Sequence, residues 1–281
     1  MTHHEAAASL LVAALATCLS FARPSRAADA ADKAPFPGKK SAYRGCDRYD
    51  FKVADRPVLV VAPKQPAPGK LWVWRAEFFD AFPGFDVAML EKGYYLVYMD
   101  VSNMYGGPQA LKLFDALYAA MTEQHGFSKK PILEGLSRGG LFVFNWAARH
   151  PDSVGCVYGD GAVCDFKSWP GGKMKGKGSP GDWQQLIKVY GFKDEAEALA
   201  YNLNPVDNLE PLAKAKVPVL MVSGDADDVV PHTENTMVVK ERYEKLGGII
   251  EVHLKPKGGH HPHGLPDPAP AVEFVLKNAL K

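Results

Sequence analysis

The sequence carries almost no excess charge of either sign, and it has no long apolar run beyond its first thirty residues. Among its 281 residues, 33 Lys and Arg stand against 32 Asp and Glu, so the formal net charge is +1. So small a charge gives no electrostatic attraction to nucleic acid or to an anionic membrane. No later stretch reaches the roughly 20 apolar residues that span a bilayer. We therefore expect one soluble globular domain that binds no nucleic acid.

The N-terminal segment differs from the rest of the chain. Residues 6–21 are almost wholly apolar or small, and Ser25 and Ala27 supply the small residues of a cleavage site. This pattern predicts a secretory signal peptide over residues 1–27, although no Lys or Arg precedes the apolar run. A disordered leader, a peripheral helix and a lipoprotein are the alternatives. We expect a secreted or periplasmic protein, without stable membrane insertion after signal cleavage, in which residues 28–48 form a linker or N-terminal extension.

Cysteine is scarce. After signal cleavage only Cys46, Cys156 and Cys164 remain, and their spacing fits no zinc motif. An exported protein can form disulfides, so we expect Cys46 to pair with Cys164. Cys156 lies in an apolar run and is expected to be a small buried side chain.

Short β-rich runs alternate with helical patterns along most of the chain. This alternation predicts an α/β fold with a mostly parallel central sheet and helices on both faces. Strands are expected at 58–61, 71–74, 94–99, 132–136, 156–159, 217–223 and 249–254. Helices are expected at 108–125, 141–150, 233–246 and 271–280.

One segment, at about 161–208, interrupts the alternation. It holds a Gly- and Lys-rich stretch at 170–178 and two short helical patterns, at 183–190 and 194–201. We expect a small cap or mobile loop inserted over the strand ends. The glycine spacing is similar to that of a phosphate-binding loop, but Gly178 stands at the Ser/Thr position and no strand leads into the stretch. A flexible, solvated loop is therefore expected.

The strongest chemical signal is the pattern Gly-x-Ser-x-Gly, formed by Gly135, Ser137 and Gly139 between a predicted strand and a predicted helix. In that setting the serine occupies a strained turn, so Gly135 and Gly139 must lack side chains where the backbone crowds neighbouring elements. The hydroxyl then projects above the sheet, and the backbone N–H of Arg138 faces a developing oxyanion. We predict that Ser137 is a nucleophile.

A serine nucleophile needs a histidine base and an acid that orients the base. In this kind of fold, the acid and then the histidine follow the serine along the chain. Three acids, Asp225, Asp227 and Asp228, follow the predicted strand at 217–223. The residues alone do not decide among them, and the acids left over are expected to shape the turn.

Three histidines, His260, His261 and His263, follow the last predicted strand and a Gly-Gly pair. One of them is expected to be the base, and the others are expected to line the pocket or hold the loop. A metal site is the competing hypothesis. A loop cluster without a carboxylate or Cys at ligand spacing is poor evidence for zinc, so no metal is expected.

The stretch from Gly224 to Pro231 resembles the α/β-hydrolase superfamily, whose pattern here is Gly-x-x-Asp-x-x-Val-Pro. The match implies that Asp227 is the acid. The superfamily places its base after a Gly-rich turn that follows the last strand, which implies His260. The resemblance covers residues 49–280.

The nearest groups are the exported bacterial dienelactone-hydrolase-like and prolyl-oligopeptidase-like hydrolases. The resemblance implies an α/β-hydrolase domain over 49–281, with the cap insertion at about 161–208. It also implies a second oxyanion donor, the N–H of Arg75 or of Ala76, where the superfamily usually has His-Gly. The guanidinium of Arg75 either reaches the pocket rim or pairs with Glu77 or Asp100 and shapes the loop.

The sequence thus predicts an exported serine hydrolase that forms an acyl-enzyme on Ser137 without a metal or an organic cofactor. Members of the resembling groups are often esterases, so we expect a carboxylic ester hydrolase acting on a small-molecule or polysaccharide-linked ester. Arg75, His263 and Trp169 are the expected substrate contacts. The alternatives are a small serine peptidase or amidase, an inactive hydrolase fold that binds a ligand, and a lyase or haloperoxidase.

Overall fold

The computed structural model describes residues 35–279, which are built around a nine-stranded sheet. The strands are β1 (Lys39–Tyr43), β2 (Cys46–Val53), β3 (Arg56–Ala62), β4 (Trp72–Ala76), β5 (Tyr95–Met99), β6 (Ile132–Leu136), β7 (Cys156–Asp160), β8 (Val219–Gly224) and β9 (Ile250–Lys255). The α-helices are α1 (Gly84–Glu91), α2 (Pro108–Ala119), α3 (Gly139–Arg149), α4 (Pro180–Tyr190), α5 (Glu195–Ala200), α6 (Glu210–Lys214), α7 (Thr236–Lys245) and α8 (Ala269–Asn278). A π-helical turn, Ala120–Gln124, extends α2, and two 3-10 turns lie at Pro151–Ser153 and Pro205–Asp207.

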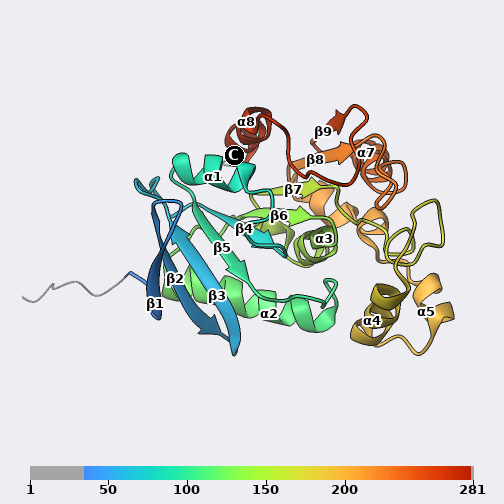
Figure 1. Ribbon diagram of the computed structural model, residues 1–281, viewed down its shortest axis with the longest axis horizontal. Coiled ribbons are helices and arrows are strands. Elements are labelled where there is room, and N and C mark those ends of the chain that lie inside the picture. Colours follow the sequence, from blue (N-terminus) through green and yellow to red (C-terminus); the bar gives the residue numbers. More distant parts are fainter. Residues whose placement is uncertain (1–34, 280–281) are drawn as a thin grey trace, which may run out of the picture. The chain divides into compact units, whose positions relative to one another are not determined.

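The sheet is antiparallel at its N-terminal side and parallel elsewhere. Its strand order is β1-β2-β3-β5-β4-β6-β7-β8-β9. The first four strands in this order, β1, β2, β3 and β5, pair antiparallel with one another. From β5 onward, through β4, β6, β7 and β8 to β9, each strand pairs parallel with the next. Figure 1 shows β6, β7 and β8 pointing the same way, so the loops that follow them meet at one edge. The predicted α/β-hydrolase fold is confirmed.

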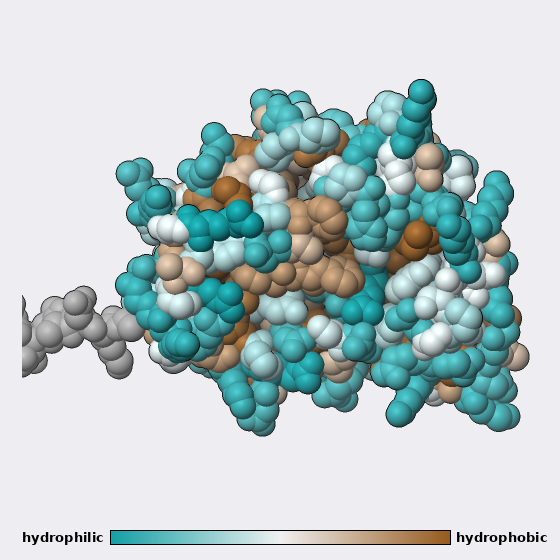
Figure 2. Space-filling view, in the orientation of Figure 1, coloured by the Kyte–Doolittle hydropathy of each residue, from teal (hydrophilic) through white to brown (hydrophobic). Residues whose placement is uncertain are grey.

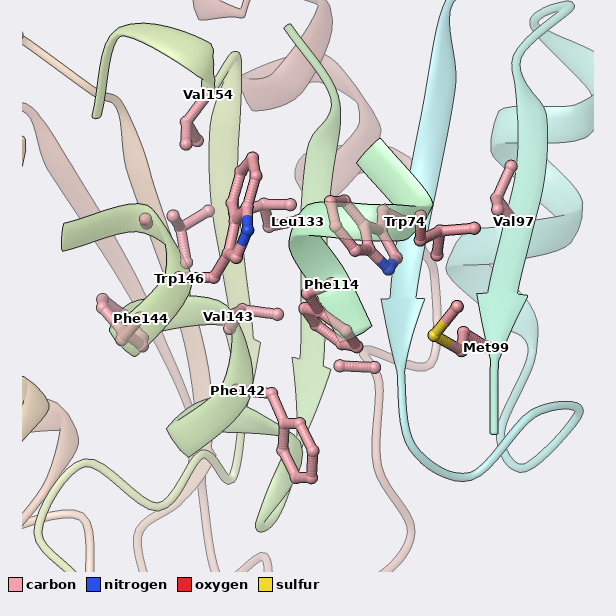
Figure 3. Packing of buried hydrophobic residues seen from close by; sticks show 14 of the residues in the cluster. Trp74, Val97, Met99, Phe114, Leu133, Phe142, Val143, Phe144, Trp146 and Val154 are labelled. Carbon is pink, nitrogen blue, oxygen red and sulfur yellow. The ribbon is translucent and has the colours of Figure 1, made fainter. Parts of the chain in front are cut away.

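Helices cover both faces of the sheet, as the sequence predicts. One face packs against α1 and α8, and the other against α2, α3 and α7. Figure 3 shows the second face, where the rings of Trp74, Phe114 and Trp146 interlock between β4, α2 and α3. The Trp74 ring lies 4.6 Å from that of Phe114 and 4.9 Å from that of Trp146. Each fully buried side chain of this kind stabilises the fold by about 2–3 kcal/mol, so α3 is held firmly behind β6.

Seven of the strands lie close to the predicted positions, whereas the two N-terminal strands were not predicted. The linker expected over 28–48 is wrong in its last part, since β1 begins at Lys39 and β2 at Cys46. β1 is an edge strand with four exposed side chains, so its sequence lacks the apolar alternation that reveals a strand. Its pairing with β2 depends on the fold around it.

The segment between β7 and β8 carries α4 and α5, which lie beyond the ends toward which β6 to β8 point (Figure 1). Trp183 and Leu186 of α4 pack with Phe166 and Tyr105 in a small hydrophobic cluster of their own. The Gly- and Lys-rich stretch at 170–178 is a loop largely exposed to solvent, as expected, and it is anchored at Gly176, which is buried. The buried carboxylate of Glu234 accepts hydrogen bonds from the hydroxyl of Ser168 (2.6 Å) and from two backbone N–H groups of the stretch, at 2.5 and 3.3 Å.

The cysteine pairing predicted from the sequence is wrong. Cys46, Cys156 and Cys164 are all free thiols. Cys46 packs at the edge of the cluster beneath α1 and α8, whereas Cys164 is buried in the cluster on the opposite face of the sheet. Cys156 is fully buried, as expected, and burial raises the pKa of its thiol.

The predicted signal peptide lies outside the described residues. Within residues 35–279, no helix is both long enough and apolar enough to cross a bilayer. Hydrophilic residues cover most of the face shown in Figure 2, and hydrophobic residues gather near its middle.

Candidate active site

Ser137 occupies a strained turn between β6 and α3. Its φ of +48° lies in the left-handed region, which costs a non-glycine residue about 1–3 kcal/mol. Close backbone packing enforces the two glycines of the motif. A Cβ on Gly135 would lie 2.6 Å from the carbonyl oxygen of Gly139, and one on Gly139 would lie 2.7 Å from that of Ala76. The Ser137 N–H donates to the carbonyl of Asp160 (2.9 Å), which fixes the turn against β7.

Three of the predicted site residues lie in one hydrogen-bonded line. Ser137 Oγ is 2.9 Å from His260 Nε2, and His260 Nδ1 is 2.8 Å from Asp227 Oδ2. Asp227 Oδ1 accepts the backbone N–H groups of Val229 (3.0 Å) and Val230 (2.8 Å). His260 and Asp227 are both largely buried. This arrangement can remove the proton of the serine hydroxyl and hold the resulting imidazolium against a carboxylate.

The two competing acids lie elsewhere. Asp225 is exposed, and Asp228 is exposed and pairs with Lys177 at 2.5 Å. Of the three aspartates, only Asp227 has a carboxylate oxygen bonded to His260. The backbone N–H groups of the same turn hold its other oxygen and so fix the direction of the carboxylate.

The other two histidines of the cluster have different surroundings. His261 is exposed, whereas His263 is 8% exposed and its Nδ1 lies 2.8 Å from Asp160 Oδ1. The three rings could bring ligand atoms within 4.8 Å of one another. Both nitrogens of His260 are already engaged, so a metal ion there would have to displace Ser137 or Asp227.

The expected role of Arg75 at the pocket rim is wrong. Its side chain is fully buried and pairs with Asp86 and with Glu134 (3.2 Å) rather than with Glu77 or Asp100. Burial opposes its charge, but Glu134 and Asp86 outweigh that effect and raise the pKa of the guanidinium.

The same guanidinium also braces the loop after β4. It donates to the carbonyl of Phe78 at 3.0 Å and to that of Ala81 at 2.5 Å. Arg75 therefore shapes this loop, which is the second role that the sequence left open, but with partners that the sequence did not indicate.

Arg75 and Ala76, the expected sources of the second oxyanion donor, are the last two residues of their strand. Both belong to β4, whose backbone pairs with β5 on one side and β6 on the other. The first residues past the paired strand are Glu77 and Phe78, with φ values of +65° and +50°. Sequence reasoning missed these two residues, although they directly follow the strand that should supply the donor.

Arg138 lies in a polar cluster next to the nucleophile. Its Nε and Nη2 donate to Glu77 Oε2 at 3.3 and 3.1 Å, and its guanidinium lies over the rings of Phe78 and Tyr105. Asp182 of α4 is 3.6 Å from Arg138 Nη1 and accepts the hydroxyl of Tyr105. Burial raises the pKa of the Glu77 carboxyl, although Arg138 opposes that effect.

Trp169, the remaining expected contact, is half-buried on the same side, with its ring 6.5 Å from that of Tyr105. A hollow of about 480 Å³ over β2, β3 and β5 does not include Ser137 among its lining residues. Ser137, Asp227 and His260 follow the ends of β6, β8 and β9, and none of them lines that hollow.

The prolyl oligopeptidase family model matches residues 89–275, a range that contains Ser137, Asp227 and His260. No curated protein matches the sequence significantly.

Solved structures resemble the fold. Dipeptidyl peptidase 4 of Porphyromonas gingivalis aligns with 86% of this chain, at a TM-score of 0.61 and 15% sequence identity. Acylaminoacyl peptidase of Pyrococcus horikoshii aligns with 83% of the chain, at a TM-score of 0.61 and 16% identity. A puromycin-hydrolyzing peptidase of Mycobacterium tuberculosis aligns with 80% of the chain, at a TM-score of 0.61 and 13% identity. The aligned parts are 36%, 41% and 37% of those longer chains. At such low identity the likeness concerns the fold alone.

Proposed function

The chain belongs to the prolyl oligopeptidase family and is a serine hydrolase, and on that premise we propose that Ser137 is its nucleophile, His260 its base and Asp227 the acid that orients the base. The observation that carries the proposal is the unbroken line of two hydrogen bonds, 2.9 and 2.8 Å long, from Ser137 through His260 to Asp227.

The reaction is acyl transfer in two steps. Ser137 Oγ attacks a carbonyl carbon while His260 Nε2 takes the hydroxyl proton, and the protonated ring then gives that proton to the leaving group. Water, activated by the same ring, releases the acyl group from Ser137. Asp227 keeps a proton on Nδ1 throughout, because its own carboxylate is held by Val229 and Val230.

We place the oxyanion between two backbone donors. One is the N–H of Arg138 at the start of α3, where the helix end also favours negative charge. The other is the N–H of Glu77 or Phe78, in place of Arg75 or Ala76, because β4 pairs up to Ala76. Loss of one such donor raises the barrier by about 3 kcal/mol.

For the substrate we propose an amide bond of a small peptide or peptide-like compound. The three similar structures are all named as peptidases, which supports an amide over the ester that the sequence led us to expect. An ester can react through the same residues and has the better leaving group. Ester cleavage therefore stays the second candidate, and one assay compares the two.

The assay uses paired chromogenic esters and aminoacyl amides with the same acyl group. The proposal expects turnover of at least one amide, with all activity lost in Ser137→Ala. Ser102→Ala, an exposed serine outside the site, is the matched control and should retain full activity. Turnover of esters alone would overturn the peptidase assignment and leave the serine hydrolase assignment intact.

Export through residues 1–27 is likewise a proposal, supported by the N-terminal sequence alone. N-terminal sequencing of the protein from cell envelope and medium tests it. A mature N-terminus near residue 28 is expected, and an intact Met1 on all of the protein would contradict it.

A further inference from the structure

A second histidine–carboxylate pair lies beside the proposed triad. His263 Nδ1 is 2.8 Å from Asp160 Oδ1, and both side chains are almost completely buried. The other oxygen of Asp160 accepts the hydroxyl of Tyr158 (3.0 Å) and the backbone N–H of Gly264 (2.5 Å). All of these partners hold the Asp160 carboxylate in one orientation, which in turn fixes the tautomer and orientation of the His263 ring.

Asp160 connects the turn that carries Ser137 with the loop that carries His260. It is the last residue of β7, and its backbone carbonyl accepts the N–H of Ser137 (2.9 Å). Its side chain holds His263 and Gly264 of the loop that also carries His260. One residue thus joins the nucleophile turn to the base loop.

The two imidazole rings are in contact. His263 packs edge-to-face on His260, with ring centroids 4.9 Å apart and planes at 78°. Gly161 makes this approach possible, because a Cβ there would lie 3.0 Å from His263 Cε1 and 3.4 Å from His260 Cε1. The ring of Phe82 lies 5.4 Å from His263 on another side.

Taking the proposed function as given, we propose that Asp160 and His263 form a second imidazole–carboxylate pair that positions His260 against Ser137. His263 is here a positioning residue. The substrate contact expected for it from the sequence is replaced by contacts with Asp160 and His260.

The test compares kcat and KM in His263→Gln, Asp160→Asn and the wild type. Both variants should lose about tenfold or more in kcat with little change in KM, because neither residue contacts the substrate.

The matched control is His253→Gln, which removes another histidine–carboxylate pair, the half-exposed His253 and Glu251 on β9. It should leave kcat and KM unchanged. Wild-type kcat in both site variants would overturn the inference, and so would a loss of kcat/KM that comes from a raised KM alone.

If either variant fails to fold, a measurement on the wild-type protein tests the inference instead. Nitrogen-15 NMR of the histidine rings should show His263 with a hydrogen-bonded proton on Nδ1 that exchanges slowly with water, and exchange as fast as in a free ring would contradict the inference. Labelling of wild-type Ser137 by a fluorophosphonate separates the two proposals. The absence of labelling would defeat the proposed function, whereas labelling of a protein whose His263 ring is not held by Asp160 would defeat only this inference.

Discussion

The buried carboxylate of Glu77 holds the guanidinium of Arg138, the residue that follows the proposed nucleophile. Glu77 is 1% exposed, and its Oε2 accepts both Nε and Nη2 of Arg138 at 3.3 and 3.1 Å. Glu77 is the first residue after β4, and Arg138 directly precedes α3. The ion pair therefore ties together the two backbone segments that we propose as oxyanion donors.

Removing this pair should damage both catalysis and folding. Glu77→Ala leaves the guanidinium of a largely buried Arg138 without its main partner, which should cost about 3 kcal/mol of unfolding free energy and tenfold or more in kcat/KM. Glu77→Gln keeps a hydrogen-bond acceptor and should lose less of both. Urea unfolding and steady-state kinetics measure the two effects. Glu91→Ala, at an exposed position at the end of α1, is the control and should match the wild type.

The buried cluster of Arg75, Asp86 and Glu134 should give stability a specific pH dependence. Burial and the neighbouring Asp86 raise the pKa of Glu134 well above its usual value, although Arg75 opposes them. Between the ordinary pKa and the raised pKa, the Glu134 carboxyl is therefore protonated in the folded protein and ionised in the unfolded chain. Glu134 thus adds stability below its ordinary pKa, and this contribution falls as the pH rises toward its folded pKa.

Glu134→Gln resembles the protonated form and removes that decline. Its free energy of unfolding should equal that of the wild type near pH 4 and exceed it at pH 7–8, with a difference that grows by about 1.4 kcal/mol per pH unit between the ordinary and the folded pKa of Glu134. Denaturant unfolding across this pH range measures the difference. Glu210→Gln, at a fully exposed carboxyl, should show no comparable gain, and a constant difference for Glu134→Gln at all pH values would contradict the account.

The turn that carries Ser137 should not tolerate an added methyl group. In Gly135→Ala, the new Cβ would lie 2.6 Å from the carbonyl oxygen of Gly139 and 2.7 Å from a methyl of Val143. Backbone cannot move aside cheaply, so we expect a loss of about 2 kcal/mol or more in stability together with most of the activity. Gly181→Ala is the matched control in α4, since no atom lies within 4 Å of the added group. It should be neutral or slightly stabilising.

Charge at the nucleophile should select against anionic substrates. Glu77 and Asp182 flank the single cation Arg138, so the cluster carries a net negative charge when both acids are ionised. We expect a neutral or cationic amide to be cleaved with a lower KM than its anionic analogue. Asp182→Asn should reduce that difference severalfold at low salt without abolishing turnover. An anionic substrate preferred by the wild type would contradict this.

The sequence predicted most of the scaffold because strand periodicity and turn residues are local signals. The motif around Ser137 fixed the strand–turn–helix order, and β6 and α3 lie where it indicated. β1 gave no such signal because its side chains are exposed and polar. Cys46 and Cys164 seemed able to pair only because the sequence does not reveal that they pack on opposite faces of the sheet.

The candidate site was predictable where one residue's role follows from its own neighbours along the chain. Asp227 and His260 each follow a strand in a recognisable pattern, and the structure brings both to Ser137. Arg75 was misplaced because its partners, Asp86 and Glu134, come from α1 and β6. Such contacts depend on tertiary packing and leave no pattern in the sequence around Arg75.

The most direct test of the central claim is labelling of the protein by a fluorophosphonate, followed by mass spectrometry of the modified peptide. The account predicts one label, on Ser137, that disappears in Ser137→Ala and His260→Ala. In Asp227→Asn labelling should be much slower, whereas Asp225→Asn, at an exposed neighbouring acid, should match the wild type. Folded wild-type protein that does not react, or that carries the label on another serine, would contradict the assignment of Ser137, His260 and Asp227.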